Sequence, residues 1–190
     1  RRAQLLASDV AVLCLPDDAA KETVAVADSL PGGGPRIVDA STAHRVAPGW
    51  VYGLPELVAD QRERIRGAAR VSNGGCWATA AILLLRPLVD AGLIAPDAPI
   101  SVHGVSGYSG GGREMIARWE DPAGGLLTQV YEAPYALDRV HKHIAEITRW
   151  SGLAHAPEFA PAVGPFRCGM RVQLPLHVAL LASGVSGKSI

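Results

Sequence analysis

Hydrophobic residues in the first third of the chain follow a strand–helix–strand order. Residues 10–15 form a short apolar run that ends at Pro16, which is typical of a strand buried on both faces of a parallel sheet. Apolar side chains at helical spacing predict a helix over residues 19–30, with Asp17-Asp18 as its capping residues. Residues 36–39 are predicted as the next strand. This order predicts an open α/β sheet.

The rest of the chain has a more mixed pattern. A helix is predicted to begin after the turn at Cys76 and to end near Gly92. We then expect a strand over residues 100–105, a flexible loop over 106–113, a helix over 114–119, an irregular loop over 159–169 and an antiparallel strand over 170–174. The change of pattern predicts two domains, over residues 1–75 and 76–190.

Three polar segments follow predicted strands of the first domain: Pro16-Asp17, Ser41-Thr42 and residues 73–76. Ligands of open α/β sheets bind at the carboxyl ends of the strands, so we expect these segments to line one crevice. The run Gly32–Gly34 follows a helix and precedes a strand. That context is wrong for phosphate binding, and we interpret the run as a connecting loop.

The turn over residues 73–76, here called the cysteine turn, places a thiol directly before an apolar helix. Gly74 and Gly75 allow a substrate to approach the backbone closely. The N–H groups and the positive dipole end of the helix favour a thiolate, which makes Cys76 a candidate nucleophile. The alternative is that Cys76 only packs in the core, because cysteine is among the most buried residue types.

Composition excludes several classes of function. The 190 residues carry 18 basic and 18 acidic side chains, so no excess of charge points to a nucleic acid or a membrane surface as partner. The cysteines at positions 14, 76 and 168 fit neither a disulfide framework nor a metal site with paired ligands, and we expect no metal and a reducing, cytoplasmic setting. Cys14 lies in a strand predicted to be buried, so we expect it to be inert. No apolar stretch is long enough to cross a bilayer.

Seven segments, in this order, carry a resemblance to a known family. They are residues 14–20, 39–45, 52–57, the cysteine turn, 106–113, Tyr135 with 141–146, and 159–170. Together they resemble N-acetyl-gamma-glutamyl-phosphate reductase, the arginine-biosynthesis enzyme that reduces an acyl phosphate to an aldehyde with NADPH. The sequences Ser-Gly-Tyr-Ser-Gly-Gly-Gly-Arg at 106–113 and Val-Gly-Pro-Phe-Arg-Cys-Gly-Met at 163–170 look most like the shorter subtype of this reductase.

The resemblance implies a Rossmann-like doubly wound parallel sheet, followed by an α+β substrate and dimerisation domain of the semialdehyde dehydrogenase type. It also implies NADPH as cofactor, a small-molecule acyl phosphate as substrate and a homo-oligomer, either a dimer or a tetramer. Members of the family begin with a strand and a Gly-rich phosphate-binding loop and end with a segment that returns to the nucleotide domain. Neither is found in these residues, so we expect a fragment of a longer protein.

The resemblance further implies site residues. Cys76 would attack the acyl phosphate to give a thioester, and His141 or His143 would transfer the proton, with the choice between them open. Glu146 would orient a histidine ring and belong to the substrate site. The other implied contacts are Arg113, Arg167, Ser106 and Ser109, with Arg45 as a third possible arginine, for the substrate and Pro16, Ser41 and Asn73 for the cofactor.

Two residues depart from the family pattern, in which the turn usually has proline where this chain has Gly74 and a smaller ring where it has Trp77. We expect the glycine to make the turn more mobile. Three other hypotheses remain open: another semialdehyde dehydrogenase such as aspartate-semialdehyde dehydrogenase, a cysteine hydrolase that needs no nucleotide, and a truncated chain that acts only as a passive subunit. The segments at 52–57 and 141–143 argue against the first of these.

Overall fold

The computed structural model describes residues 1–129 and 131–188. The chain divides into two compact units, Arg1–Leu83 and Leu84–Ile190, and each is described by itself. No helix in the described residues is long and apolar enough to cross a membrane.

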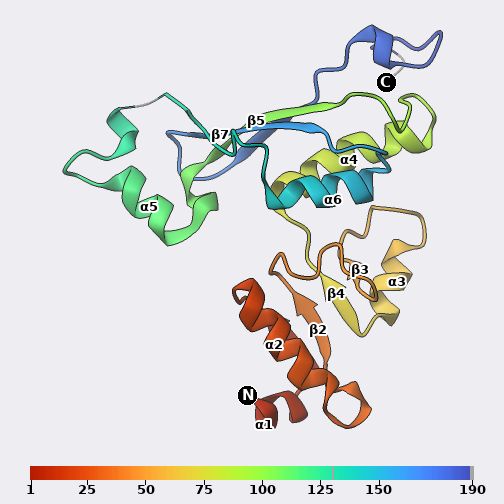
Figure 1. Ribbon diagram of the computed structural model, residues 1–190, viewed down its shortest axis with the longest axis vertical. Coiled ribbons are helices and arrows are strands. Elements are labelled where there is room, and N and C mark those ends of the chain that lie inside the picture. The colour runs from red at the N-terminus through yellow and green to blue at the C-terminus, as the bar shows by residue number, and fades with distance from the viewer. Residues whose placement is uncertain (130, 189–190) are drawn as a thin grey trace. The chain divides into compact units, whose positions relative to one another are not determined.

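The first unit is built on a four-stranded sheet in the order β1-β2-β4-β3, and every pair of neighbouring strands is parallel (Figure 1). This confirms the parallel α/β sheet expected from the sequence. Its elements are α1 (Arg2–Leu6), β1 (Val10–Leu13), α2 (Asp17–Asp28), β2 (Arg36–Asp39), β3 (Val51–Tyr52), α3 (Gln61–Gly67) and β4 (Arg70–Ser72).

The expectation that the first strand is buried on both faces is wrong. Val10 and Val12 are 52% and 65% exposed, whereas Leu13 is buried in a core cluster with residues of α2. Successive side chains of a strand point to opposite faces, and β1 lies at the edge of the sheet with one face packed on α2. Cys14, expected to be inert inside this strand, follows it and is exposed.

The helix α2 begins two residues earlier than expected. Its N-cap is Pro16, without a side-chain capping bond, so the capping role expected for Asp17-Asp18 is wrong. Both aspartates lie in the first turn, where a carboxylate suits the positive end of the helix dipole. The glycines at 32–34 all have positive φ angles and form a turn between α2 and β2, which confirms the loop interpretation.

The second unit is built on a four-stranded sheet in the order β6-β7-β5-β8 (Figure 1). The strand β5 pairs in parallel with β7 and antiparallel with β8, as expected for the last strand. The C-terminal part of α4 lies beside α6, where Arg86 Nη1 donates to the carbonyl of Trp150 at 3.2 Å. The elements are α4 (Cys76–Asp90), which starts in the first unit, β5 (Ser101–Gly107), α5 (Gly112–Glu120), β6 (Ala133–Pro134), α6 (Lys142–Ser151), β7 (Glu158–Gly164) and β8 (Met170–Gln173).

The irregular loop expected over residues 159–169 is wrong for its first half, because β7 occupies residues 158–164 inside the sheet. Pro161 suggested a loop, since proline cannot donate to a ladder. Its carbonyl accepts a hydrogen bond from the Tyr135 N–H at 3.1 Å. The N and C=O of one residue in a strand point the same way, so the missing donor faces the two-residue strand β6 and β7 keeps its ladder with β5.

The flexible loop expected over residues 106–113 is also wrong. Ser106 and Gly107 end β5, and Tyr108–Gly111 form a 3-10 helix, η2, that leads directly into α5. Backbone N–H groups of Gly107, Tyr108 and Ser109 donate to carbonyls of residues 169, 166 and 167 at 2.9–3.0 Å. These tertiary hydrogen bonds order a segment whose glycines and serines suggested mobility.

Candidate active site

Cys76 is the first residue of α4, and its side chain is exposed. Its exposure contradicts the alternative that it packs in the core. The turn before it is fixed by a hydrogen bond from the Asn73 N–H to the Asp39 carbonyl at 2.7 Å, and the helix begins with a bond from the Thr79 N–H to the Gly75 carbonyl at 2.8 Å. The thiol therefore lies at the N-terminus of a well-anchored helix.

Gly74 is tightly packed rather than loosely placed. A Cβ added at this position would lie 2.5 Å from the hydroxyl oxygen of Tyr52 and 2.9 Å from that of Thr79. Tyr52 is only 1% exposed, so its ring cannot swing away easily. The greater mobility expected from glycine here is not supported, because the turn is enclosed by side chains of β3 and α4.

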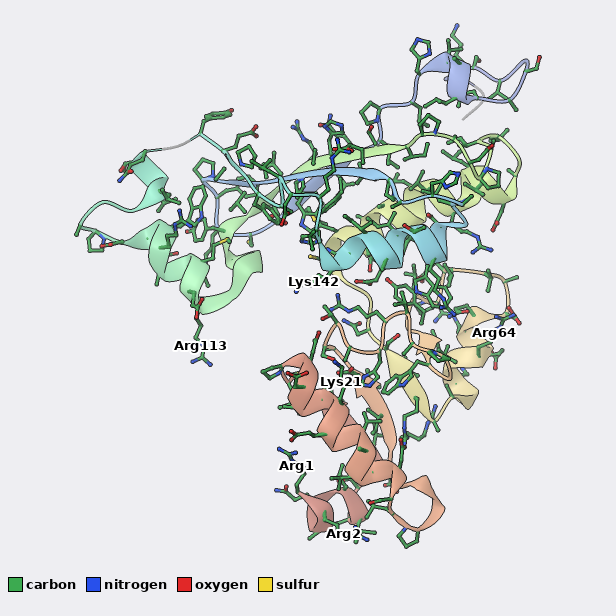
Figure 2. The ribbon with its side chains drawn as sticks, in the orientation of Figure 1. Arg1, Arg2, Lys21, Arg64, Arg113 and Lys142 are labelled. Carbon is green, nitrogen blue, oxygen red and sulfur yellow. The ribbon has the colours of Figure 1, made fainter. Side chains whose placement is uncertain are left out.

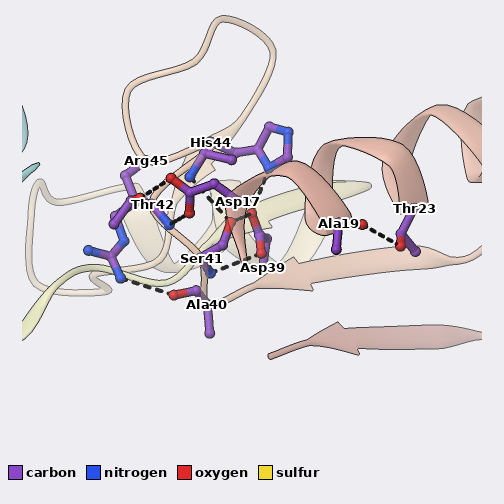
Figure 3. A network of polar contacts seen from close by, with 10 residues as sticks. Asp17, Ala19, Thr23, Asp39, Ala40, Ser41, Thr42, His44 and Arg45 are labelled. Atoms are coloured by element: carbon purple, nitrogen blue, oxygen red, sulfur yellow. Dashed lines mark hydrogen bonds and ion pairs between the residues drawn. The ribbon is translucent and has the colours of Figure 1, made fainter. Parts of the chain in front are cut away.

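A buried carboxylate organises the loop after β2 (Figure 3). Asp39 is fully buried; its Oδ1 accepts from the Ser41 N–H at 3.0 Å and its Oδ2 accepts from the Ser41 hydroxyl at 2.6 Å. His44 Nδ1 lies 2.6 Å from the same Oδ2, and the His44 ring stacks on Trp50 at a centroid distance of 4.1 Å. Ser41, a predicted cofactor contact, is buried, and its hydroxyl is bound to Asp39, so it shapes this loop.

The same loop is held from two further sides (Figure 3). The Asp17 carboxylate accepts from the Thr42 N–H at 2.9 Å and from the Thr42 hydroxyl. Arg45 is 8% exposed and its Nη2 donates to the Ala40 carbonyl at 3.0 Å. Arg45 therefore supports the loop and does not present its guanidinium as an exposed anion site.

The loops after β1, β2 and β4 leave the carboxyl ends of parallel strands, where dinucleotides bind in such sheets. Pro16 and Asn73, both predicted as cofactor contacts, are exposed there. These residues fit one end of a nicotinamide dinucleotide. Ser41 affects this edge of the sheet only by holding the loop after β2 in shape, through its bond to Asp39.

In the second unit, His141 is the N-cap of α6 and its Nδ1 accepts from the His143 N–H at 3.1 Å. Burial, followed by the charge of Lys142, lowers the pKa of His141 below its usual value of 6.5. Because Nδ1 accepts a hydrogen bond, the neutral ring carries its proton on Nε2. His141 is therefore a neutral hydrogen-bond donor at neutral pH.

We expect His141→Ala to destabilise α6 by about 1 kcal/mol and His141→Asn, which retains a capping oxygen, to cost much less.

The lowered folded-state pKa of His141 means that the unfolded chain binds the proton more readily. Stability should therefore be full above about pH 6.5 and fall as the pH drops through the lowered pKa, less steeply for His141→Asn. Urea unfolding monitored by amide exchange in α6 tests the loss of stability and its pH dependence. If the stability of the unaltered chain and that of His141→Asn depend on pH in the same way, the prediction about pH is contradicted.

His143 and Glu146 are both buried in this helix, 4% and 1% exposed, and His143 Nε2 lies 4.0 Å from Glu146 Oε1. At 4.0 Å these two atoms lie beyond hydrogen-bond distance of each other. The rings of His141 and His143 meet edge to face at 4.7 Å, and Phe159 lies 4.8 Å from His141. The structure thus brings His141, His143 and Glu146 together, as expected.

The residues predicted to bind the anionic groups of the substrate lie in different surroundings. Arg113 is exposed near the start of α5 and extends away from the helix (Figure 2). Arg167 is exposed but its Nη1 lies 3.2 Å from Glu120 Oε1, which also accepts from the Tyr108 hydroxyl at 2.8 Å and raises the pKa of Tyr108 through that bond. Ser106 lies in β5, and Ser109 lies in η2, where its N–H is bound to the Arg167 carbonyl.

Sequence reasoning missed Asp39, His44 and Glu120. A signal existed for Asp39, because an aspartate two residues before a serine at a strand end is typical of a side chain that bonds its own loop backbone. No local signal pointed to His44, whose partner lies 5 residues away, or to Glu120, whose partners lie 12 and 47 residues away. Within the described residues, no three side chains of histidine, cysteine, aspartate or glutamate are grouped as a metal ion would require.

Comparison with known proteins places the chain in a family. The semialdehyde dehydrogenase NAD-binding domain matches residues 1–67 and the semialdehyde dehydrogenase dimerisation domain matches residues 76–189. The chain is 47% identical over its whole length to N-acetyl-gamma-glutamyl-phosphate reductase 2 of Pseudomonas putida and 45% identical to the reductase of Rhizobium leguminosarum, of which it spans 59% and 61%. The resemblance expected from the sequence is confirmed.

Solved structures agree on the fold. Aspartate semialdehyde dehydrogenase II of Vibrio cholerae matches 87% of this chain and 54% of its own, with a TM-score of 0.65 at 15% identity. A probable aspartate-semialdehyde dehydrogenase of Pseudomonas aeruginosa matches 90% of this chain and 55% of its own, with a TM-score of 0.62 at 17% identity. With both of its domains matched, the chain belongs to the semialdehyde dehydrogenase family.

Proposed function

We propose that this chain carries the thiol half of an NADPH-dependent reductase that converts N-acetyl-glutamyl 5-phosphate to N-acetyl-glutamate 5-semialdehyde and phosphate, in arginine biosynthesis. The observation that carries the proposal is the exposed thiol of Cys76 at the N-terminus of α4. The identity with the reductases of Pseudomonas putida and Rhizobium leguminosarum supports this substrate.

Cys76 acts as the nucleophile. Its Sγ forms a bond to the acyl carbon, the bond from that carbon to the phosphate oxygen breaks, and phosphate leaves with the electron pair. The N-terminal N–H groups of α4 stabilise the negative charge on the acyl oxygen. Pro16 and Asn73 would hold NADPH, which would supply the hydride that reduces the thioester. The carbon–sulfur bond then breaks, and the aldehyde is released from Sγ.

We assign to His143 the transfer of the proton from the Cys76 thiol, and to His141 the binding of substrate. The cap bond keeps Nδ1 of His141 unprotonated, so its ring donates from Nε2 but is a poor proton carrier. Glu146 lies beside His143 and orients its ring. Arg113, Arg167, Ser106 and Ser109 bind the carboxylate and phosphate of the substrate. Turnover retained in His143→Asn but lost in His141→Asn would reverse the two assignments.

The test of the function is NADPH oxidation by the chain in the presence of the acyl phosphate, together with the reverse reaction from aldehyde, NADP and phosphate. A reductase consumes nucleotide and acyl phosphate in equal amounts. A cysteine hydrolase consumes acyl phosphate without nucleotide, and a passive subunit consumes neither. A preference for the aspartyl over the N-acetyl-glutamyl phosphate would indicate an aspartate-semialdehyde dehydrogenase instead.

We also propose that the chain forms a homo-oligomer, a dimer or a tetramer, through the face of the second sheet that carries His103, Ala160 and Gln173. These three residues are in register on neighbouring strands and are exposed in the described chain. The match of residues 76–189 to a dimerisation domain supports the proposal. A charged side chain in place of Ala160 should shift the mass measured by light scattering to that of one chain. An unchanged oligomer would exclude this face.

A further inference from the structure

Asp39, at the end of β2, is fully buried; its carboxylate binds the loop that follows β2, and its main-chain carbonyl binds the start of the cysteine turn. We propose that Asp39 is a positioning residue that fixes the backbone of the cysteine turn, and thereby the thiol of Cys76, through two connected routes. The inference rests on the proposed function in taking Cys76 as the nucleophile.

The carboxylate is the centre of both routes. Its two oxygens face the N–H and hydroxyl of Ser41 and Nδ1 of His44, at 3.0, 2.6 and 2.6 Å. The Ser41 hydroxyl in turn accepts from the Ala43 N–H at 3.2 Å. An ionised carboxylate offers acceptor sites for all three donors, whereas an amide offers one oxygen only. The loop over residues 40–44 is therefore wrapped around one fully buried carboxyl group.

The first route runs through the backbone. The Asp39 carbonyl accepts from the Asn73 N–H at 2.7 Å, directly after Asp39 pairs with Ser72 in the parallel ladder. Asn73 is where the chain leaves β4 and enters the cysteine turn, three residues before Cys76. The residue whose side chain anchors one loop thus anchors the start of the turn with its main chain.

The second route runs through aromatic rings. His44, held by Asp39, stacks on Trp50 with an interplanar angle of 13°. Trp50 precedes β3, whose residues Val51 and Tyr52 pair with Val71 and Ser72 of β4. The hydroxyl of Tyr52 closes on Gly74, where an added Cβ would lie 2.5 Å from it. Both routes end on adjacent residues of the cysteine turn.

The test is Asp39→Asn in the full chain, with amide exchange measured residue by residue. We expect exchange to rise about tenfold at Asn73 and at residues 41–44, while the amides of α2 keep their protection. In the same samples, alkylation of Cys76 by iodoacetamide should change by about threefold or more relative to Cys168, which serves as an internal reference. Mass spectrometry of the cysteine peptides separates the two rates.

A matched control is Asp28→Asn, which removes an exposed carboxylate that lies 2.6 Å from Arg70 at the other end of β4. It should leave exchange at Asn73 unchanged. If Asp39→Asn does not fold, Ser41→Ala and His44→Phe each remove one bond to the carboxylate, and His44→Phe retains a ring against Trp50. Each should then raise exchange at Asn73 by a smaller factor.

Faster exchange confined to residues 41–44, or spread evenly over the first unit, would overturn the proposal. The first result would make Asp39 a local loop anchor, and the second a general stabiliser of the fold. The proposed function fails separately, if Cys76 of the unaltered chain forms no thioester with the acyl phosphate. The exchange measurement does not depend on that result.

Discussion

Replacing Cys76 by serine is expected to lower the release of phosphate from N-acetyl-glutamyl phosphate by about a thousandfold or more. In the absence of nucleotide the unaltered chain should release about one phosphate per chain and stop, because the thioester accumulates on Cys76. The serine hydroxyl remains protonated at neutral pH and is a far weaker nucleophile than a cysteine sulfur at the same helix terminus. Rapid-quench measurement of phosphate, with mass analysis of the peptide that contains residue 76, checks both statements.

The other two cysteines provide the controls. Cys14 and Cys168 are exposed like Cys76, so accessibility alone does not distinguish the three thiols. Neither begins a helix: Cys14 follows β1, and Cys168 lies between β7 and β8. Cys14→Ser and Cys168→Ser should therefore keep the phosphate burst. A burst that survives in Cys76→Ser, or that is lost in either control, would contradict the assignment.

The size of the burst also distinguishes a reductase from a hydrolase. A cysteine hydrolase would carry the thioester on to water and release phosphate continuously without nucleotide. A reductase keeps the thioester until a hydride arrives. A single burst without nucleotide, followed by turnover when NADPH is added, is the result expected for this chain.

Substituting alanine for Gly107 is expected to destabilise the second unit by about 2–3 kcal/mol. A Cβ at this position would lie 2.7 Å from the carbonyl carbon and oxygen of Arg167 and from Cα of Cys168, all of them backbone atoms. Backbone cannot move aside as the end of a long side chain can. The collision should break the bonds by which the Gly107 and Ser109 N–H groups hold the carbonyls of Gly169 and Arg167.

Gly110 supplies the matched control, since it lies in the adjacent 3-10 helix η2 and an added Cβ there meets nothing within 4 Å. Gly110→Ala should change the free energy of unfolding by less than about 0.5 kcal/mol. Urea unfolding of the two variants measures the difference. If both variants have the same stability, the close approach at Gly107 does not limit the fold. Displacement of the loop over residues 166–169 would also move Arg167, so we expect Gly107→Ala to weaken substrate binding.

Local patterns predicted much of the first unit. The strand at 36–39 was predicted with its observed bounds, and α2 and α4 were predicted within two or three residues, because each pattern arises from neighbours in the chain. The prediction that an apolar helix follows the glycine turn is confirmed for the same reason, and the helix includes Cys76 as its first residue. The second unit was predicted less completely. Pro161 and the glycines at 110–112 indicate loops when their hydrogen-bond partners are not known.

Sequence by itself determined the strand–helix–strand order over residues 10–39, the position of the candidate thiol and, through seven ordered segments, the family. Each of these depends on residue type and spacing along the chain, which folding does not change. Only the tertiary structure decided that Cys14 is exposed, that β7 lies inside a sheet, that His141 caps α6 through Nδ1, and that Asp39 links the loop after β2 to the cysteine turn. Those properties depend on which distant backbone and side-chain groups meet, and a hydrogen-bond partner 34 residues away in the chain leaves no local mark on the sequence.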